Sequence, residues 1–130
     1  MILIDSNIPM YLVGGAHPNR QRAHELLELA IGRRERLVTD AEAFQEILRR
    51  YVAIDRRDAI RPAWKTLREL VDDIFPIELE DVEAARRLVV SSRLTARDAL
   101  HVAVMKRRGV AEILTFDHDF DGLPGIRRRV

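Results

Sequence analysis

Four acidic residues lie at positions where apolar neighbours would ordinarily exclude a carboxylate: Asp5, Glu46, Asp98 and Asp117. Asp5 and Asp117 each follow a short apolar run typical of a buried strand, and the other two lie in or beside apolar helical segments. Converging carboxylates repel one another, and burial raises their pKa further, unless a cation is bound between them. Oxygen-only ligands favour the hard cations Mg²⁺ and Mn²⁺. Such an ion can activate water and neutralise a phosphoryl group, so the four acids predict metal-assisted phosphodiester hydrolysis.

Each acid, taken alone, also has a purely structural interpretation. Asp98 can complete a helix cap that begins at Thr95, and Asp5 can stabilise the turn after its strand. Glu46 alone would more often be a solvated helix residue. The acidic segment 117–121 has the composition of a turn, from which at most one or two carboxylates would reach a metal. Only the conjunction of the four acids favours a catalytic site.

The elements that would position these acids follow from the apolar pattern. Short apolar runs at 2–5, 37–38, 74–77, 111–116 and 126–128 predict strands. Helical periodicity at 19–33, 58–71, 81–91 and 96–108, and in a helix after Thr39, predicts βαβ units. We therefore expect one domain over residues 1–130, a three-layer α/β/α sandwich with a mostly parallel sheet of four to five strands. Strand ends then bring Asp5 and Asp117 to one edge, where ligands bind in such sheets.

The composition excludes several classes of protein. With 22 Lys+Arg against 21 Asp+Glu and a net charge of +1, a uniformly basic nucleic-acid coat protein and an acidic disordered tail are not expected. Setting aside the four candidate ligands leaves 17 of the 21 acidic residues to face the 22 basic ones, so the near neutrality partly reflects an acidic pocket. The absence of cysteine excludes disulfides, thiolate zinc sites and cysteine nucleophiles. No run is typical of a signal peptide or a membrane span, so we expect a soluble, cytoplasmic protein.

Four segments in this order resemble the PIN-domain family and, within it, the VapC-like toxins of bacterial toxin–antitoxin pairs. The segments are residues 2–7 (Ile-Leu-Ile-Asp-Ser-Asn), 46–48 (Glu-Ile-Leu), 94–101 (Leu-Thr-Ala-Arg-Asp-Ala-Leu-His) and 114–120 (Leu-Thr-Phe-Asp-His-Asp-Phe). The resemblance runs essentially from end to end.

By this resemblance the four acids match the family's acidic quartet, which holds the metal. Asn7 and Thr115 take supporting positions, and Asp119 is a weaker supporting candidate. Glu42 could be mistaken for the third acid, but with Thr39 it has the spacing of a capping box and lacks the following Ile-Leu, so Glu46 is chosen.

The resemblance implies a Mg²⁺- or Mn²⁺-dependent endoribonuclease that cleaves structured RNA such as tRNA or rRNA. It also implies a homodimer and a cognate antitoxin protein. Arginine pairs are candidates for RNA contacts, although only a minority should reach RNA: 33–34, 49–50, 56–57 and 107–108. His101 is expected to be a buried histidine packed beside Asp98.

Three other classes remain open at this point. A housekeeping RNA- or DNA-processing nuclease of the same fold would use the same chemistry on another substrate. A non-catalytic RNA- or protein-binding module would keep the fold without turnover. A phosphoaspartyl enzyme is disfavoured because Asp5 has no second acid two positions on, and no suitable lysine follows the fourth strand.

Overall fold

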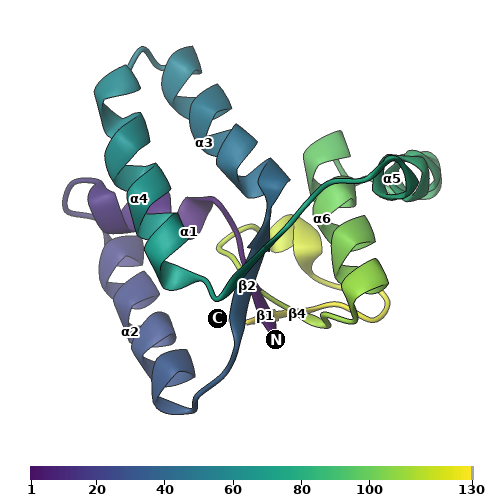
Figure 1. Cartoon of the computed structure of the whole chain (residues 1–130), viewed down its shortest axis with the longest axis horizontal. Helices are drawn as coiled ribbons and strands as arrows, with labels where there is room; N and C mark the ends of the chain where they lie inside the picture. The colour runs from purple at the N-terminus through teal and green to yellow at the C-terminus, as the bar shows by residue number, and fades with distance from the viewer. Residues whose placement is uncertain (130) are drawn as a thin grey trace.

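The computed structural model describes residues 1–129 and contains a five-stranded sheet in the order β3-β2-β1-β4-β5, with every pair of neighbours parallel (Figure 1). The strands are β1 (Ile2–Ile4), β2 (Leu37–Asp40), β3 (Asp73–Phe75), β4 (Glu112–Leu114) and β5 (Arg127–Arg129). The helices are α1 (Asn7–Val13), α2 (Pro18–Gly32), α3 (Ala41–Ala53), α4 (Ile60–Leu70), α5 (Leu79–Ser91) and α6 (Ala96–Arg108). Two short 3-10 segments, η1 (Arg57–Ala59) and η2 (His118–Phe120), complete the elements. The expected parallel sheet is confirmed.

The side chains of β1 alternate between two apolar cores, one on each face of the sheet. Ile2 and Ile4 lie in the first core, whereas Leu3 lies in the second. As the central strand, β1 is covered on both faces, so all three side chains are buried. This is why its sequence is continuously apolar instead of alternating with polar residues.

Helices cover both faces of the sheet and give the predicted three layers (Figure 1). The first core packs side chains of α1 to α4, such as Leu27 and Phe44, against one face. The second packs side chains of α5 and α6, such as Ala85 and Val102, against the other. Seven residues of α6 are buried, which explains its nearly continuous apolar sequence. The fold is an α/β/α sandwich.

The helix ends confirm one predicted cap and correct another. Thr95 caps α6 by accepting a hydrogen bond from the Asp98 backbone N–H, and Gly109 ends that helix with φ +69°, where a glycine belongs. The predicted Thr39–Glu42 capping box at α3 is wrong, because Asp40 is the N-cap and accepts from the Ala43 N–H. Thr39 instead donates from its hydroxyl to the Ile4 carbonyl at 2.7 Å, which ties β2 to β1.

The helical periodicity at 19–33, at 81–91 and after Thr39 places Ile31, Leu48 and Val82 on inward-facing stripes, but all three are exposed. Ile31, Leu48 and Val82 keep 58%, 39% and 46% of their surface accessible. Each lies at the border of its helix's apolar stripe, where the covering sheet or helix does not reach. The remaining stripe positions predicted for α2 and α3 are buried, so the helix orientations are as expected.

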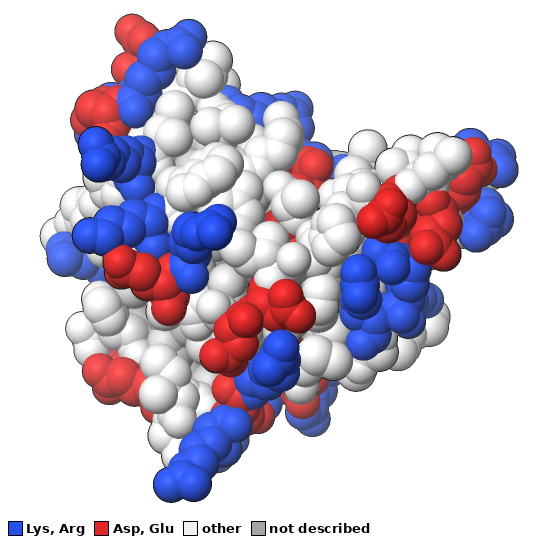
Figure 2. All heavy atoms as spheres, viewed as in Figure 1, with Lys and Arg blue, Asp and Glu red and all other residues white. Residues whose placement is uncertain are grey.

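The surface carries both signs of charge. Figure 2 shows basic and acidic side chains interspersed over one face, in agreement with the balanced composition. Within residues 1–129, every helix is too short or too polar to cross a membrane.

Candidate active site

The carboxyl ends of β1 and β4 meet at one edge of the sheet and join residues that are far apart in the chain. Asp5 follows β1 and Thr115 follows β4, its parallel neighbour. The Thr115 hydroxyl donates a 2.6 Å hydrogen bond to Asp5 Oδ2. Asn7 Nδ2 lies 3.0 Å from Thr115 Oγ1 and 3.3 Å from Asp5 Oδ2. Asn7 and Thr115, two of the three residues predicted to support the site, therefore both contact the Asp5 carboxylate.

A buried histidine holds the second acid. Glu46, in α3, accepts a 2.8 Å hydrogen bond at Oε1 from His101 Nε2 and a 2.5 Å bond at Oε2 from the Ser6 hydroxyl. The other ring nitrogen, Nδ1, lies 2.7 Å from Asp40 Oδ2. Because both nitrogens face carboxylates, an imidazolium that donates from each satisfies the whole chain of contacts. Burial alone would lower the pKa of His101, but the charge and hydrogen bond of Asp40 and the bond to Glu46 raise it well above its ordinary value.

The same histidine lowers the pKa of both neighbouring acids, but the net shifts of these two pKa values are opposite. Burial would raise the pKa of Glu46, but the hydrogen bond and charge of His101 outweigh burial and hold that pKa below its ordinary value. His101 Nε2 lies farther from Asp5, at 3.7 Å from Oδ1. For Asp5, burial outweighs the attraction of His101, and the charge of Glu46 acts in the same direction as burial, so the pKa of Asp5 is raised.

A second group of carboxylates lies at the start of α6 and after β4. Asp98, Asp117 and Asp119 each offer an oxygen, and these atoms lie within 4.8 Å of one another. Asp98 is placed by the Thr95 cap, and Asp117 Oδ1 accepts a 2.9 Å bond from the Asp119 N–H. Burial, together with the charges of Asp117 and Asp5, raises the pKa of Asp98 to about 6. Thr115 joins the two groups, because its hydroxyl donates to Asp5 Oδ2 and accepts a 3.0 Å hydrogen bond from the Asp117 N–H.

We call the residues of these two groups, without His101, the acidic site: Asp5, Glu46, Asp98, Asp117 and Asp119. Its donor chemistry fits a divalent cation. The ligands are oxygen atoms, since both nitrogens of the one nearby histidine are engaged by carboxylates. The raised pKa values of Asp5 and Asp98 reflect burial and repulsion, and a bound cation relieves both effects.

The four predicted acids fall into two adjoining groups. Asp5 and Glu46 lie beside His101, whereas Asp98 and Asp117 lie together with Asp119. Asp119, the weaker candidate from the sequence, therefore takes a place beside two of the principal ones. Among the described residues, Glu42 belongs to neither group. Their roles as metal ligands stay predictions.

The sequence analysis missed two residues that contact the acidic site and assigned the wrong hydrogen-bond partner to a third. Ser6 and Asp40 were not among the candidates, yet both are buried and contact the Glu46–His101 pair. His101 is buried as expected, but its hydrogen-bond partners are Asp40 and Glu46 instead of Asp98. Asp40 carried a usable signal, because it ends a buried strand just as Asp5 follows one.

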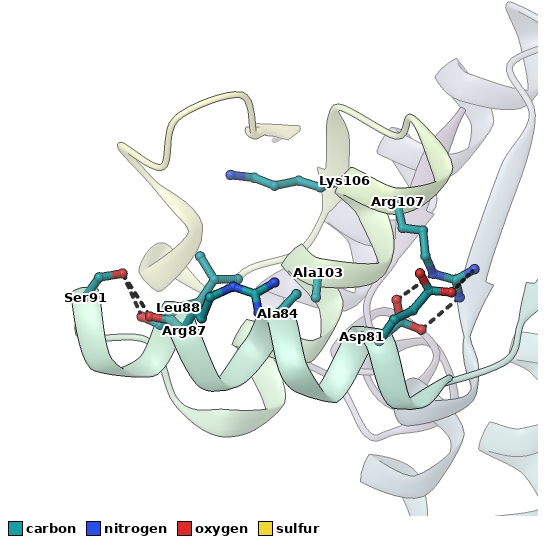
Figure 3. A pocket seen from close by; sticks show the side chains of 9 residues that line it. Asp81, Ala84, Arg87, Leu88, Ser91, Ala103, Lys106 and Arg107 are labelled. Carbon is teal, nitrogen blue, oxygen red and sulfur yellow. Dashed lines mark hydrogen bonds and ion pairs between the residues drawn. The ribbon is translucent and has the colours of Figure 1, made fainter.

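A cavity lies between α5 and α6, away from the acidic site (Figure 3). It has a volume of about 410 Å³ and is lined partly by Arg87, Lys106 and Arg107. Arg107 was an RNA-contact candidate, but its guanidinium donates 2.7 and 2.8 Å hydrogen bonds to the carboxylate of Asp81. This buried aspartate fixes the side chain across the two helices, so Arg107 has a structural role.

Comparison with known proteins agrees with the fold. The model of the PIN domain family matches residues 2–126. The chain belongs to the PIN domain family, and the relatives within it are VapC ribonucleases. VapC ribonuclease Mb1869c of Mycobacterium bovis and ribonuclease VapC13 of Mycobacterium tuberculosis are each 55% identical to it over 129 residues, covering 98% of both chains. Ribonuclease VapC23 of Mycobacterium tuberculosis is 46% identical over 119 residues, covering 91% of this chain and 94% of its own.

Solved structures share the fold at lower sequence identity. VapC20 of Mycobacterium tuberculosis, described as a sarcin-ricin loop cleaving toxin, superimposes with a TM-score of 0.71 at 19% identity, covering 98% of this chain and 99% of its own. VapBC2 of Rickettsia felis, bound to a DNA fragment of its promoter, gives 0.74 at 12% identity, covering 99% and 98%. A toxin–antitoxin complex from Klebsiella pneumoniae gives 0.69 at 20% identity, covering 98% and 96%. These likenesses concern the fold alone.

Proposed function

We propose that this protein is a metal-dependent endoribonuclease and the toxin of a toxin–antitoxin pair. The observation that carries the proposal is the acidic site, in which carboxylates from four separate segments adjoin at the carboxyl edge of a parallel sheet. Relatives that are 55% identical over nearly the whole chain are VapC ribonucleases, which supports the same reaction here. We propose that residues 1–130 form one nuclease domain.

The proposed reaction divides the residues of the site into those that hold the cation and those that orient its ligands. Asp5, Glu46, Asp98 and Asp117 would hold Mg²⁺ or Mn²⁺, with support from Asp119. When bound, this ion supplies an activated water molecule and neutralises charge on the phosphate. Thr115 and Asn7 orient the Asp5 carboxylate through the hydrogen bonds described above.

Ser6 and His101 orient the Glu46 carboxylate, as Thr115 and Asn7 orient that of Asp5. They fix both carboxylate oxygens, so that Glu46 keeps one orientation. Asp40 in turn holds the imidazole ring from the other side. No side chain has to form a covalent intermediate, because hydrolysis by a metal-activated water needs none.

The comparisons also support proposals about substrate and partners. One structural neighbour is described as cleaving the sarcin-ricin loop, so a structured RNA of the tRNA or rRNA class is the proposed substrate. Two neighbours are toxin–antitoxin assemblies, so a cognate antitoxin is the proposed protein partner. We further propose a homodimer that acts in the cytoplasm.

The proposal is tested on total cellular RNA with purified wild type, Asp98→Asn and Glu42→Gln. Wild type is expected to produce discrete fragments with Mn²⁺ and none with EDTA. Asp98→Asn should lower the rate at least about 100-fold, because the substitution removes a ligand of the cation that would neutralise transition-state charge. Glu42→Gln is the matched control, since Glu42 is a half-buried acid outside the acidic site. Cleavage that survives chelation, or equal cleavage by wild type and Asp98→Asn, would contradict the proposal.

A further inference from the structure

A cavity of about 410 Å³ opens beside Glu46 and is distinct from the cavity between α5 and α6. We propose that it binds one unpaired nucleotide of the RNA strand, next to the phosphate that is cleaved. The inference rests on the proposed ribonuclease function and adds a substrate pocket to it. The residues that carry it are Met10, Tyr11, Arg50, Ile54 and Arg97, together with Glu46.

The cavity is continuous with the acidic site. Ser6, Asn7 and Glu46 line it, and the same three residues form the hydrogen bonds that hold the acidic site. A ligand in the cavity therefore lies within reach of the carboxylates that would hold the metal. An RNA strand that presents a phosphate to those carboxylates must place a neighbouring nucleotide on an adjoining surface, and this cavity adjoins them.

Two arginines give the cavity a charge that suits a polyanion. Arg50 is exposed on α3, and Arg97 is half-buried in the first turn of α6. Neither guanidinium forms an ion pair with any of residues 1–129, in contrast to Arg107 and Arg129. The positive charge of Arg97 nevertheless lies close enough to contribute to the lowered pKa of Glu46. Unpaired guanidinium groups beside a catalytic site are well suited to bind phosphate oxygens.

The remaining wall is apolar and includes an aromatic ring that is held in place. Tyr11 makes an edge-to-face contact with Phe116, with ring centroids 5.3 Å apart, and its centroid lies 4.9 Å from that of His17. Met10 and Ile54 supply apolar surface in the same cavity. An aromatic side chain next to such surface is a platform on which an unpaired base can stack.

The volume and the charge together favour one nucleotide as the occupant. Small-ligand pockets typically enclose roughly 300–1,000 Å³, and a single nucleotide fits the lower part of that range. RNA recognition commonly uses unpaired bases that leave the helix and stack on aromatic side chains. A protein segment would not require unpaired arginines at this place, whereas the phosphates on either side of a nucleotide do.

The test measures RNA binding separately from cleavage. A labelled single-stranded RNA 12-mer is titrated in EDTA against the Asp98→Asn protein and against the same protein with Arg50→Gln, Arg97→Gln or Tyr11→Leu. Each arginine substitution is expected to weaken binding roughly three- to tenfold and to reduce the slope of log K against log salt by about 0.7. Tyr11→Leu should weaken binding roughly fivefold or more with an unchanged slope, because stacking does not release counterions.

Arg49→Gln is the matched control, because Arg49 is an exposed arginine on the same helix that does not line the cavity. It should change the affinity less than about twofold. Thermal unfolding of every variant confirms that it is folded. If Arg50→Gln and Arg97→Gln bind RNA as tightly as Arg49→Gln does, the inference is overturned, and a protein segment becomes the better occupant. Failure of the proposed function would instead appear as absence of RNA cleavage by wild type with Mn²⁺, whatever the affinities.

Discussion

Asp98, a proposed metal ligand, lies in an environment that is unfavourable for its charge. Its pKa of about 6 arises from burial and from the charges of Asp117 and Asp5. At neutral pH the carboxylate is therefore ionised at a place where the folded protein disfavours the charge. A raised pKa of an acid means that the folded state binds the proton more tightly than the unfolded state, so stability falls as the pH rises from about 4 to about 6.

This leads to a prediction about stability at this residue. In EDTA at pH 7.5, Asp98→Asn should increase the free energy of unfolding by about 1–2 kcal/mol, because the substitution removes the buried charge. The gain should shrink to near zero at pH 4, where the wild-type carboxyl group is protonated. Urea unfolding at the two pH values measures both effects. Addition of Mg²⁺ should stabilise the wild type and leave the stability of the variant unchanged. A variant that is less stable than wild type at pH 7.5 would refute the claim that the ionised Asp98 carboxylate destabilises the fold.

The positions of Asp5 and Asp117 could be predicted from the sequence, because both residues follow predicted strands. Asp5 and Asp117 could be placed at one edge because they follow buried apolar runs of a parallel sheet. The contact of His101 with Asp40 and Glu46 could not be predicted, since it depends on how closely α6 packs against α3. The exposure of Ile31, Leu48 and Val82 could not be predicted either, because periodicity predicts which face of a helix is apolar but not how much of that face the neighbouring elements bury.

At the scale of elements, His101 is the junction of three segments. It belongs to α6, contacts Glu46 in α3, and contacts Asp40 at the end of β2. Asp40 also caps α3 through its other oxygen, so one carboxylate joins the strand, the helix that follows it and a helix on the opposite face. The predicted Thr39 cap failed because the sheet uses the Thr39 hydroxyl, which left the next residue to cap the helix.

A double-mutant cycle tests this junction. His101→Gln should lower the free energy of unfolding by about 3 kcal/mol, because it leaves two buried carboxylates without their cation. In a Glu46→Gln background the loss should be smaller by about 1 kcal/mol or more, since one of those charges is gone. Urea unfolding at pH 7 gives both values, and Lys65→Gln, at an exposed position of α4, serves as the control. Strictly additive effects would show that His101 is only a packing residue.

The stabilising effect of His101 also has a defined pH range. A histidine whose pKa is raised in the folded state stabilises the fold fully below its ordinary pKa and loses that effect as the pH rises through the raised value. The wild type should therefore lose stability in the alkaline range, and His101→Gln should not show that part of the decline.

At the scale of the whole molecule, ionic contacts of the last strand join distant parts of the chain. Arg129, in β5, bonds to Glu112 in β4 at 2.7 Å and to Glu35, just before β2, at 2.6 and 3.0 Å. The hydrogen bonds to the arginine lower the pKa of both glutamates. Its side chain is 18% exposed, so these bonds are better shielded from solvent than those of Arg127, which is 72% exposed.

Removal of this contact should weaken the fold measurably. Arg129→Gln is expected to lower the free energy of unfolding by about 1–2 kcal/mol, because several charge-assisted bonds are lost at a partly shielded site. Arg127→Gln, which removes an exposed bond to the same Glu112, should change it by less than about 0.5 kcal/mol. Urea unfolding at low and at 1 M salt measures both, with the Arg129 effect reduced at high salt. Equal effects of the two substitutions would be inconsistent with the proposed shielding.

The pairing of β1 with β4 also determines when the site can exist during synthesis. Asp5 leaves the ribosome first, but its partners Asp98, Thr115 and Asp117 belong to the last quarter of the chain. Contacts between residues so distant in sequence form late in folding. A nascent chain that has not yet released residue 117 lacks Asp117 and Asp119, two of the five residues of the acidic site. The topology therefore separates the translating ribosome from the finished catalytic site until synthesis of the domain is nearly complete.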